Sequence, residues 1–356
     1  MLKKRREVSE MIKEWNLLRT IACLSIVFLH STTQTGRAVG YPEIEHYNML
    51  RTALCYATPT FIVLSEIILA NRYPDRLPEK FWSKRFKWIF APYAAFAIID
   101  AFVTKHFTPG TDLGERIFLN LVMGNYEGYF ILIIFQFYLL HYVITKYKIP
   151  TNWLLPASLM IMVAHLTILN GNLPFVQENR NHLKIPFTAW IGYFAIAYII
   201  GKHYQSFAKK IWKYKWLSLV GVAIAIFYFF MSYQSGNFRV ASYRHDLFPL
   251  VLAIIVAVFA WGQLVPNLKV INLISNYSFG IYLVHWQVQR FLAPYVAPYF
   301  EHTSTRVIGL FFITLAVSIV IIKIIHALPF GSYIVGNVKR RVGKRKAGYQ
   351  VEPKAA

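Results

Sequence analysis

The feature that most constrains this chain is a series of apolar runs, each close to 20 residues long, that recurs along the whole sequence. A helix needs about 20 consecutive apolar residues to cross the hydrocarbon core of a bilayer. Hydrophobic residues make up 56% of the 356 residues and charged residues only 15%, whereas soluble domains carry about 25% charged residues. The sequence therefore predicts an all-α, polytopic integral membrane protein.

Ten membrane-spanning helices are predicted from these runs. They cover residues 16–33, 49–70, 86–105, 127–145, 152–169, 185–202, 215–233, 247–264, 274–295 and 307–328. The apolar segment 114–124 is too short to span, and we expect it to lie at the interface or to re-enter the membrane. The chain then divides into a basic N-terminal tail (1–14), a ten-helix membrane domain (15–330) and a basic C-terminal tail (331–356).

Basic residues predict the orientation of these spans. Of the 38 Lys and Arg residues, 26 lie in the two tails and the even-numbered connections, and ten lie in the odd-numbered connections. Cytoplasmic loops carry an excess of Lys and Arg, which places both termini in the cytoplasm. Because the basic residues form short clusters between apolar runs, the net charge of +22 indicates membrane topology and lipid contact rather than nucleic-acid binding.

The two cysteines offer no metal or disulfide signature. Cys23 and Cys55 both lie inside apolar runs, and their spacing fits neither kind of site. We interpret both as packing residues, and we predict no metal site in this chain.

The first span, LLRTIACLSIVFLH (17–30), carries two groups that hydrocarbon tolerates badly. Arg19 and His30 are eleven residues apart, which places them on one face of a helix about 16 Å from each other. Ionisable residues inside spans usually face a protein interior or a wet cavity. The residues alone also allow a plainer interpretation, in which Arg19 reaches the head groups and His30 is a neutral packing residue.

Other ionisable residues in spans provide candidate partners for this pair. Glu66 lies near the cytoplasmic end of the second span, at about the depth of Arg19. A buried Glu needs a cation, so we expect Glu66 to pair with Arg19. Asp100 and His165 lie toward the outer side, near the depth of His30, and either could orient its imidazole.

The ninth span, around SNYSFGIYLVHWQV (275–288), is also rich in polar groups. Its hydroxyls and imidazole belong to Ser275, Tyr277, Ser278, Tyr282 and His285. These residues could support a membrane site, and ordinary hydrogen bonding between helices is the alternative interpretation. Gly280 is expected to allow a neighbouring helix to approach closely.

A basic cluster stands at the cytoplasmic entrance to the third span. Lys84, Arg85 and Lys87 lie beside the aromatic residues Trp82 and Trp88. Topological anchoring accounts for such a cluster. Three cations beside aromatic rings would also suit a phosphate-bearing ligand that arrives from the cytosol.

Taken together, these segments resemble the integral-membrane acyltransferase 3 family, which includes bacterial cell-surface glycan O-acyltransferases. The family's first helix carries an Arg and a His separated by ten residues, matched here by Arg19 and His30. Its later motifs are matched by PTFIVLSE, FWSKRFKWIFAPY, EGYFILIIFQFYLL and NYSFGIYLVH, in the expected order. The departure is Glu66, where the family usually has Gly.

The resemblance implies transfer of an acetyl or other short acyl group from acyl-CoA to a hydroxyl of a cell-surface or cell-wall polysaccharide. It implies that His30 is the general base or acyl-handling residue and that Arg19 is its partner in the motif. Lys84, Arg85 and Lys87 would hold the CoA phosphates. The expected partners are acyl-CoA, a glycan acceptor and the lipids of a bacterial plasma membrane, with no bound cofactor.

Two other functions fit a polytopic protein with a polar interior. The first is an export component or transporter for a surface polysaccharide, although no pair of Gly- or Pro-broken spans occupies corresponding halves of the sequence, as inverted-repeat transporters have. The second is a non-catalytic scaffold or sensor. Loss of an exporter would trap polymer inside the cell, whereas loss of an acyltransferase would leave it outside and unmodified.

Overall fold

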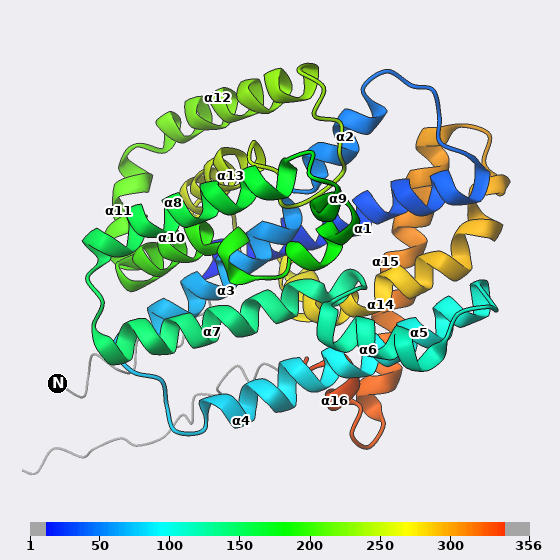
Figure 1. The fold of residues 1–356 in the computed structure, drawn as a ribbon, viewed down its shortest axis with the longest axis horizontal. Helices are drawn as coiled ribbons and strands as arrows, with labels where there is room; N and C mark the ends of the chain where they lie inside the picture. The colour runs from blue at the N-terminus through cyan, green and yellow to red at the C-terminus, as the bar shows by residue number, and fades with distance from the viewer. Residues whose placement is uncertain (1–11, 339–356) are drawn as a thin grey trace, which may run out of the picture.

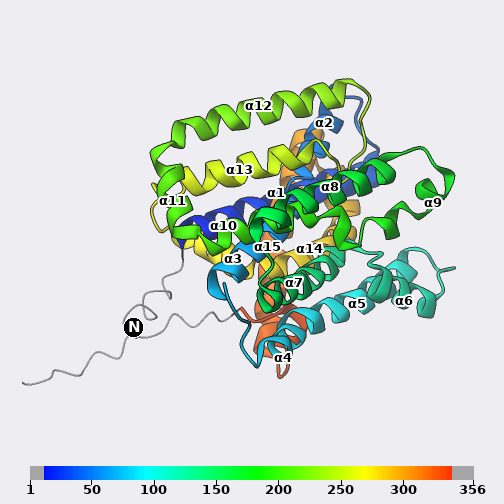
Figure 2. The ribbon, with the colours of Figure 1, turned by 60° about the vertical axis from the view of Figure 1, so that its left-hand side comes forward.

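The computed structural model describes residues 12–338, and every regular element in this range is a helix. The helices form one bundle in which α1 (Lys13–Val39) contacts α2, α3, α13, α14 and α15. Figure 1 shows α1 passing through the middle of the bundle, and Figure 2 shows α12 along one outer edge. The prediction of an all-α fold is confirmed.

The other elements follow in chain order. The first half contains α2 (Tyr47–Leu54), α3 (Ala57–Arg72), α4 (Phe81–Arg85), the π-helical turn η2 (Phe86–Phe90), α5 (Ala91–Phe107), α6 (Leu113–Met123), the 3-10 turn η3 (Glu127–Tyr129), α7 (Phe130–Tyr147) and α8 (Thr151–Asn170). The second half contains α9 (Pro174–Leu183), η4 (Phe187–Ala189), α10 (Ile191–Lys202), α11 (Tyr204–Lys213), α12 (Lys215–Gln234), α13 (Leu247–Trp261), α14 (Lys269–Tyr299), α15 (Thr303–Ala327) and α16 (Ser332–Val335).

Several of these helices have the length and composition of membrane spans. Six stretches qualify: Tyr47–Arg72, Phe81–Phe107, Leu113–Tyr147, Thr151–Asn170, Lys215–Gln234 and Thr303–Ala327. They coincide with six of the ten predicted spans, so the multi-pass membrane character is supported. Of the other four, α10 and α13 are shorter apolar helices, whereas α1 and α14 are long but more polar.

The polarity of α1 and α14 has a structural reason, because the two helices direct polar side chains at each other. Asn16 donates to Asn272 at 3.0 Å near one end of the contact, and Gln289 donates to Ser31 at 2.9 Å near the other. Residue numbers rise together along this seam, so α1 and α14 run parallel. These hydrogen bonds engage polar groups within the protein, which makes a polar helix tolerable in an apolar surrounding.

Helices pack closely at two glycines, Gly280 on α14 and Gly201 on α10. A Cβ atom added to Gly280 would lie 2.9 Å from the Cδ1 atom of Ile322 on α15 and 3.2 Å from the backbone oxygen of Val335 on α16. Gly280 therefore permits the close approach that was predicted for it. Gly201 acts similarly, because a Cβ atom there would lie 2.5 Å from the backbone oxygen of Ile67 on α3.

The structure describes the short segment 114–124 in full but only a small part of the two tails. The segment forms the 11-residue helix α6, which Asp112 caps by accepting from the Glu115 backbone N–H at 2.7 Å, and which packs against α5. The basic tails 1–14 and 331–356 lie mostly outside the described residues. The most basic part of the C-terminal tail, KRRVGKRK (339–346), lies wholly outside them.

Candidate active site

The centre of the candidate site is His30, buried on α1 near the end of its seam with α14. Its Nε2 atom lies 3.4 Å from a carboxylate oxygen of Glu127. Its ring packs against the rings of His285 and Trp286, with centroids 5.2 Å and 4.9 Å away. The buried Nδ1 atom has no hydrogen-bond partner among residues 12–338.

His285 brings a second imidazole to the same place. Its Nδ1 atom lies 3.0 Å from the backbone carbonyl oxygen of Ile281, one turn earlier on α14. A carbonyl oxygen only accepts, so a neutral His285 carries its proton on Nδ1 and a lone pair on Nε2. That Nε2 atom is buried and unpaired within the described part of the chain. The site therefore contains two imidazoles, each with one nitrogen available for proton transfer.

Glu127 is the carboxylate that the sequence reasoning missed. It begins the 3-10 turn η3 directly before α7, and about a third of its side chain is exposed. The hydroxyl of Tyr282, on α14, donates to the backbone carbonyl of Glu127 and fixes this turn. The signal in the sequence was an acidic residue at the first position of an otherwise apolar span, which is a costly place for a carboxylate.

Asp100 occupies a different position from the one predicted. Its carboxylate accepts from Gln287 at 2.8 Å and from Asn120 at 3.0 Å, and it pairs with Arg116 and Arg290 at 3.4 Å and 3.5 Å. These contacts join α5, α6 and α14 instead of orienting His30. Sequence depth placed Asp100 at a suitable level, but its carboxylate faces α6 and α14.

His165 also fails to orient His30. Its Nε2 atom contacts the backbone carbonyl of Leu183 at 2.9 Å, and its Nδ1 atom contacts the Thr188 hydroxyl at 2.8 Å. Both ring nitrogens are therefore engaged with the connection between α8 and α10. The carboxylate beside His30 is that of Glu127, and the prediction that Asp100 or His165 fills this role is wrong.

The predicted pair of Glu66 with Arg19 is likewise wrong. Glu66 lies 2.8 Å from the Nδ1 atom of His141 on α7, and both side chains are fully buried. Arg19 instead donates to the Ser275 hydroxyl at 3.1 Å and to the Asn16 side chain at 3.4 Å. The two residues share a depth, but Glu66 faces α7 whereas Arg19 faces α14.

The remaining polar residues of the ninth span divide between the site and the helix seam. Ser275 contacts Arg19, as described, and Ser278 donates back to the Ser275 carbonyl at 2.9 Å. Tyr282 and His285 belong to the site around His30. The alternative interpretation, hydrogen bonding between helices, therefore describes Ser275, whereas Ser278 bonds within its own helix.

The basic cluster of the third span lies on α4 and η2. Arg85 stacks over the rings of Phe81 and Tyr138 at 4.8 Å and 5.0 Å, and Lys87 lies 4.8 Å from the ring of Trp88. Lys84 is exposed. Tyr138 lies one turn before His141 on α7, so the cluster and the Glu66–His141 pair share one end of that helix.

The described residues hold no group of three or more His, Cys, Asp or Glu side chains arranged to bind a metal ion. Both cysteines are free and buried. What the site around His30 can do chemically is move a proton: one carboxylate flanks one imidazole, and a second imidazole lies against the first.

A helical membrane protein with a carboxylate beside a buried imidazole is the class that fold and site together define. The sequence profile of a family described as an acyltransferase domain matches residues 12–323. The chain belongs to this family, so the predicted resemblance and the prediction of an acyltransferase are both confirmed.

Curated relatives carry two kinds of name. A putative membrane-bound acyltransferase, YfiQ, from Bacillus subtilis is 35% identical over 290 residues, covering 77% of this chain and 80% of that protein. A probable poly-beta-1,6-N-acetyl-D-glucosamine export protein from Staphylococcus aureus is 25% identical over 288 residues, covering 75% and 79%. Its Staphylococcus epidermidis counterpart is 24% identical over 281 residues, covering 75% and 78%. No solved structure matches the chain.

Proposed function

We propose that this protein transfers an acetyl or other short acyl group from acyl-CoA to a hydroxyl of a cell-surface or cell-wall polysaccharide. The observation that carries the proposal is the contact between His30 and Glu127 within an acyltransferase-family chain. The names of the relatives, an acyltransferase and a polysaccharide export protein, support the reaction class and the acceptor class respectively.

In this proposal His30 is the general base. Glu127 holds the proton on Nε2, so the lone pair of Nδ1 is free to take the proton of the acceptor hydroxyl. The acceptor oxygen then attacks the thioester carbonyl, the carbon–sulfur bond breaks, and the imidazolium returns its proton to the leaving CoA thiolate. The 3.4 Å separation of His30 and Glu127 is long for a hydrogen bond, and such contacts tighten when substrates bind.

The proposed topology has ten spans and both termini in the cytoplasm of a bacterial plasma membrane. The excess of Lys and Arg in the tails and even-numbered connections supports it. The parallel packing of α1 and α14 also supports it, because the first and ninth spans of such a bundle cross in the same direction. The organisms of the relatives support a bacterial membrane.

Under this topology Lys84, Arg85 and Lys87 face the cytosol, where acyl-CoA is made, and His30 lies toward the outside, where the polysaccharide is. The clamped positions of Arg85 and Lys87 over aromatic rings suit them to hold phosphates at a fixed place. The polar seam of α1 and α14 connects the two depths. We propose that the thioester end of acyl-CoA reaches His30 along it.

The test is mass spectrometry of surface glycans from cells that lack the protein and are complemented with wild-type or His30→Ala protein. Membrane fractionation checks that the variant inserts. The proposal expects that ester groups disappear in the variant while polymer still reaches the outside. Unchanged glycan esters in the variant would overturn it.

An export function is the second candidate, and the relatives named as export proteins favour it. The same cells distinguish the two functions. Polymer held inside cells without the protein indicates export, whereas unmodified polymer outside the cells indicates acyl transfer.

A further inference from the structure

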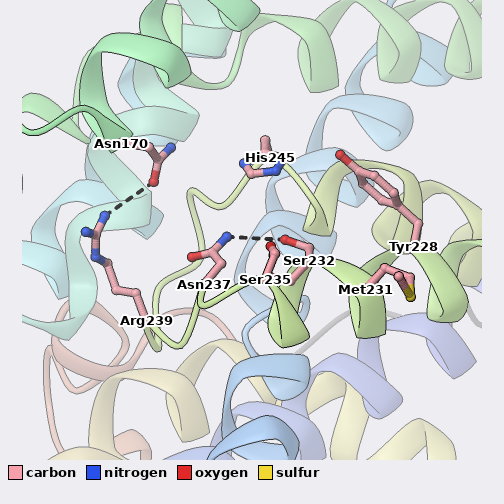
Figure 3. A pocket seen from close by; sticks show the side chains of 8 residues that line it. All are labelled: Asn170, Tyr228, Met231, Ser232, Ser235, Asn237, Arg239 and His245. Carbon is pink, nitrogen blue, oxygen red and sulfur yellow. Dashed lines mark hydrogen bonds between the residues drawn. The ribbon is translucent and has the colours of Figure 1, made fainter.

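A pocket in the described part of the chain is separate from His30 and has no role in the reaction described above. It has a volume of about 480 Å³ and lies where the end of α8, the end of α12 and the connection 235–246 meet. Figure 3 shows its lining side chains, which are Asn170, Tyr228, Met231, Ser232, Ser235, Asn237, Arg239 and His245. We call it the α8–α12 pocket. Its volume is within the range of about 300–1,000 Å³ that is usual for small-molecule sites.

The lining offers both hydrogen-bond donors and acceptors. Amide, hydroxyl and imidazole groups dominate, and each of these can donate and accept. Tyr228 and Met231 add an apolar wall that is about half exposed. Sugars have the matching chemistry, since their hydroxyls donate and accept while the C–H faces of the ring pack on aromatic and apolar side chains.

The charge in the pocket is already partly engaged. Arg239 donates to the side chain of Asn170 at 3.3 Å and shares a hydrogen bond with Tyr243. An anionic lipid head group would need a free cation together with a long apolar groove for its chains. The lining favours a neutral polyol over a phospholipid.

The loop beneath the pocket is held rigidly. Arg244 and Asp246 form a fully buried ion pair. The same guanidinium donates to the backbone carbonyls of Asn237 and Arg239, and the bond to Arg239 is 3.1 Å long. A buried, multiply bonded Arg fixes the backbone of two lining residues in advance, which lowers the entropy cost of binding.

This loop also touches the elements that carry the candidate active site. Ser242 shares a hydrogen bond with Tyr129, two residues after Glu127 in the same turn. Asn48, on α2, donates to the backbone carbonyl of Phe238 at 2.8 Å. On the same helix Arg51 contacts Thr33, which is three residues after His30. The loop that lines the pocket therefore contacts η3, which carries Glu127, and α2, which contacts α1 near His30.

We propose that the α8–α12 pocket binds sugar units of the polysaccharide acceptor and so places a neighbouring hydroxyl near His30. This inference rests on the proposed function, because it assigns the acceptor to a place outside the reacting centre. A binding site beside the chemistry lets energy from a remote part of the substrate position the reacting group.

The test measures binding without catalysis, using the full-length protein in nanodiscs. The probes are a β-1,6-linked N-acetylglucosamine pentasaccharide and an α-1,6-linked glucose pentasaccharide. Saturation-transfer NMR measures the binding of each probe. The variants Asn237→Ala and Tyr228→Ala remove pocket groups, and Asn179→Ala on α9 is the matched control, since its amide donates only to a backbone carbonyl of its own helix. Thermal unfolding shows that each variant is folded.

The expected result is that at least one saccharide binds to the wild-type protein and binds about tenfold more weakly to the pocket variants, the loss expected for one or two hydrogen bonds. The Asn179→Ala protein should bind like the wild type. Equal binding by the pocket variants, or no binding of either saccharide to the wild type, would overturn the assignment.

Native mass spectrometry adds a separate outcome. A phosphatidylglycerol molecule retained by the wild-type protein, lost from Asn237→Ala and not displaced by saccharide would assign the pocket to a lipid and overturn the proposal. Failure of the proposed function would give a different result. The wild-type protein would then bind saccharide in this pocket but would transfer no acyl group to it from acetyl-CoA.

Discussion

Two histidine–carboxylate pairs lie toward opposite ends of α7, and they differ in how completely their imidazole nitrogens are hydrogen-bonded. In the pair of His141 with Glu66, both imidazole nitrogens are engaged, one by the carboxylate at 2.8 Å and one by the backbone carbonyl of Tyr73 at 2.9 Å. In the pair of His30 with Glu127, the contact is 3.4 Å long and one imidazole nitrogen is unpaired within residues 12–338.

The two pairs also differ in their access to substrate. Glu66 and His141 are fully buried, whereas about a third of the Glu127 side chain is exposed. Glu127 and His141 are 14 positions apart along the chain, a separation of roughly 20 Å on a helix. A closed pair whose imidazole has both nitrogens hydrogen-bonded stabilises the bundle, and an open pair with a free lone pair can exchange a proton with a substrate. We therefore assign structure to the first pair and chemistry to the second.

The largest effect on catalysis should follow from removing the basic ring nitrogen of His30 while keeping a polar side chain of similar size. We expect His30→Gln to lower the acyl-transfer rate about 10²- to 10⁴-fold, the usual contribution of a general base. Its unfolding temperature in detergent should change little, because the ring makes few hydrogen bonds. Transfer of radiolabelled acetyl from acetyl-CoA to a saccharide acceptor measures the rate.

His165→Gln is the matched control for this variant. His165 has both ring nitrogens engaged, as His141 does, and it lies outside the candidate site. Its replacement should leave the rate within a few-fold of the wild type. A similar loss of rate in both variants would remove the distinction between satisfied and free imidazoles.

For the closed pair, Glu66 with His141, we expect a large loss of stability and little loss of transfer rate. Glu66→Leu leaves His141 buried without its partner, which should lower the free energy of unfolding by about 3–5 kcal/mol. Thermal unfolding in detergent measures this loss, and the fraction that remains folded should keep most of its transfer rate.

A double replacement separates the loss of the pair from the loss of packing. Glu66→Leu combined with His141→Phe exchanges both polar partners for apolar groups and should recover much of the stability. A further fall in stability in the double variant would show that Glu66 and His141 also stabilise the bundle through contacts other than the one between them. Non-additive effects of Glu66→Leu and Arg19→Ala would revive the rejected Glu66–Arg19 pairing.

The sequence predicted how deep the ionisable side chains lie in the bundle but not which side chains they contact. The periodic apolar runs predicted helices at all ten places, and the polar residues of the first and ninth spans pointed to His30, Tyr282 and His285 as site candidates. Hydropathy fixes how deep a residue lies. The direction in which it faces depends on packing between helices that are distant in sequence, so Glu66 was paired with Arg19 instead of His141.

Glu127 escaped prediction for a related reason. A carboxylate at the start of an apolar run looks like an ordinary interfacial residue, and only the turn η3, fixed by Tyr282, brings it to His30. The same holds for the α8–α12 pocket, because its lining comes from two helices and a loop with no shared motif.

An intermediate effect is expected from Asp100, which ties α5, α6 and α14 together behind the site. Asp100→Asn keeps the shape of the side chain but leaves Arg116 and Arg290 without their anion. We expect a loss of about 1.5–3 kcal/mol in the free energy of unfolding, the value of hydrogen bonds to a charged group. Glu115→Gln, at an exposed position on α6, is the control and should change stability little. Equal stability of the two variants would contradict a structural role for Asp100.

The smallest effect tests whether the open pair depends on its turn. Tyr282→Phe removes the hydroxyl that donates to the Glu127 carbonyl, and Tyr93→Phe removes a similar one that donates to the Asn120 carbonyl at 2.7 Å. Each variant should lose about 0.5–1.5 kcal/mol of stability, the net value of one hydrogen bond. Only Tyr282→Phe should also lower kcat, by roughly three- to tenfold, because Glu127 is then less well placed against His30. If both variants lose stability and neither loses kcat, Tyr282 stabilises the bundle without positioning the carboxylate.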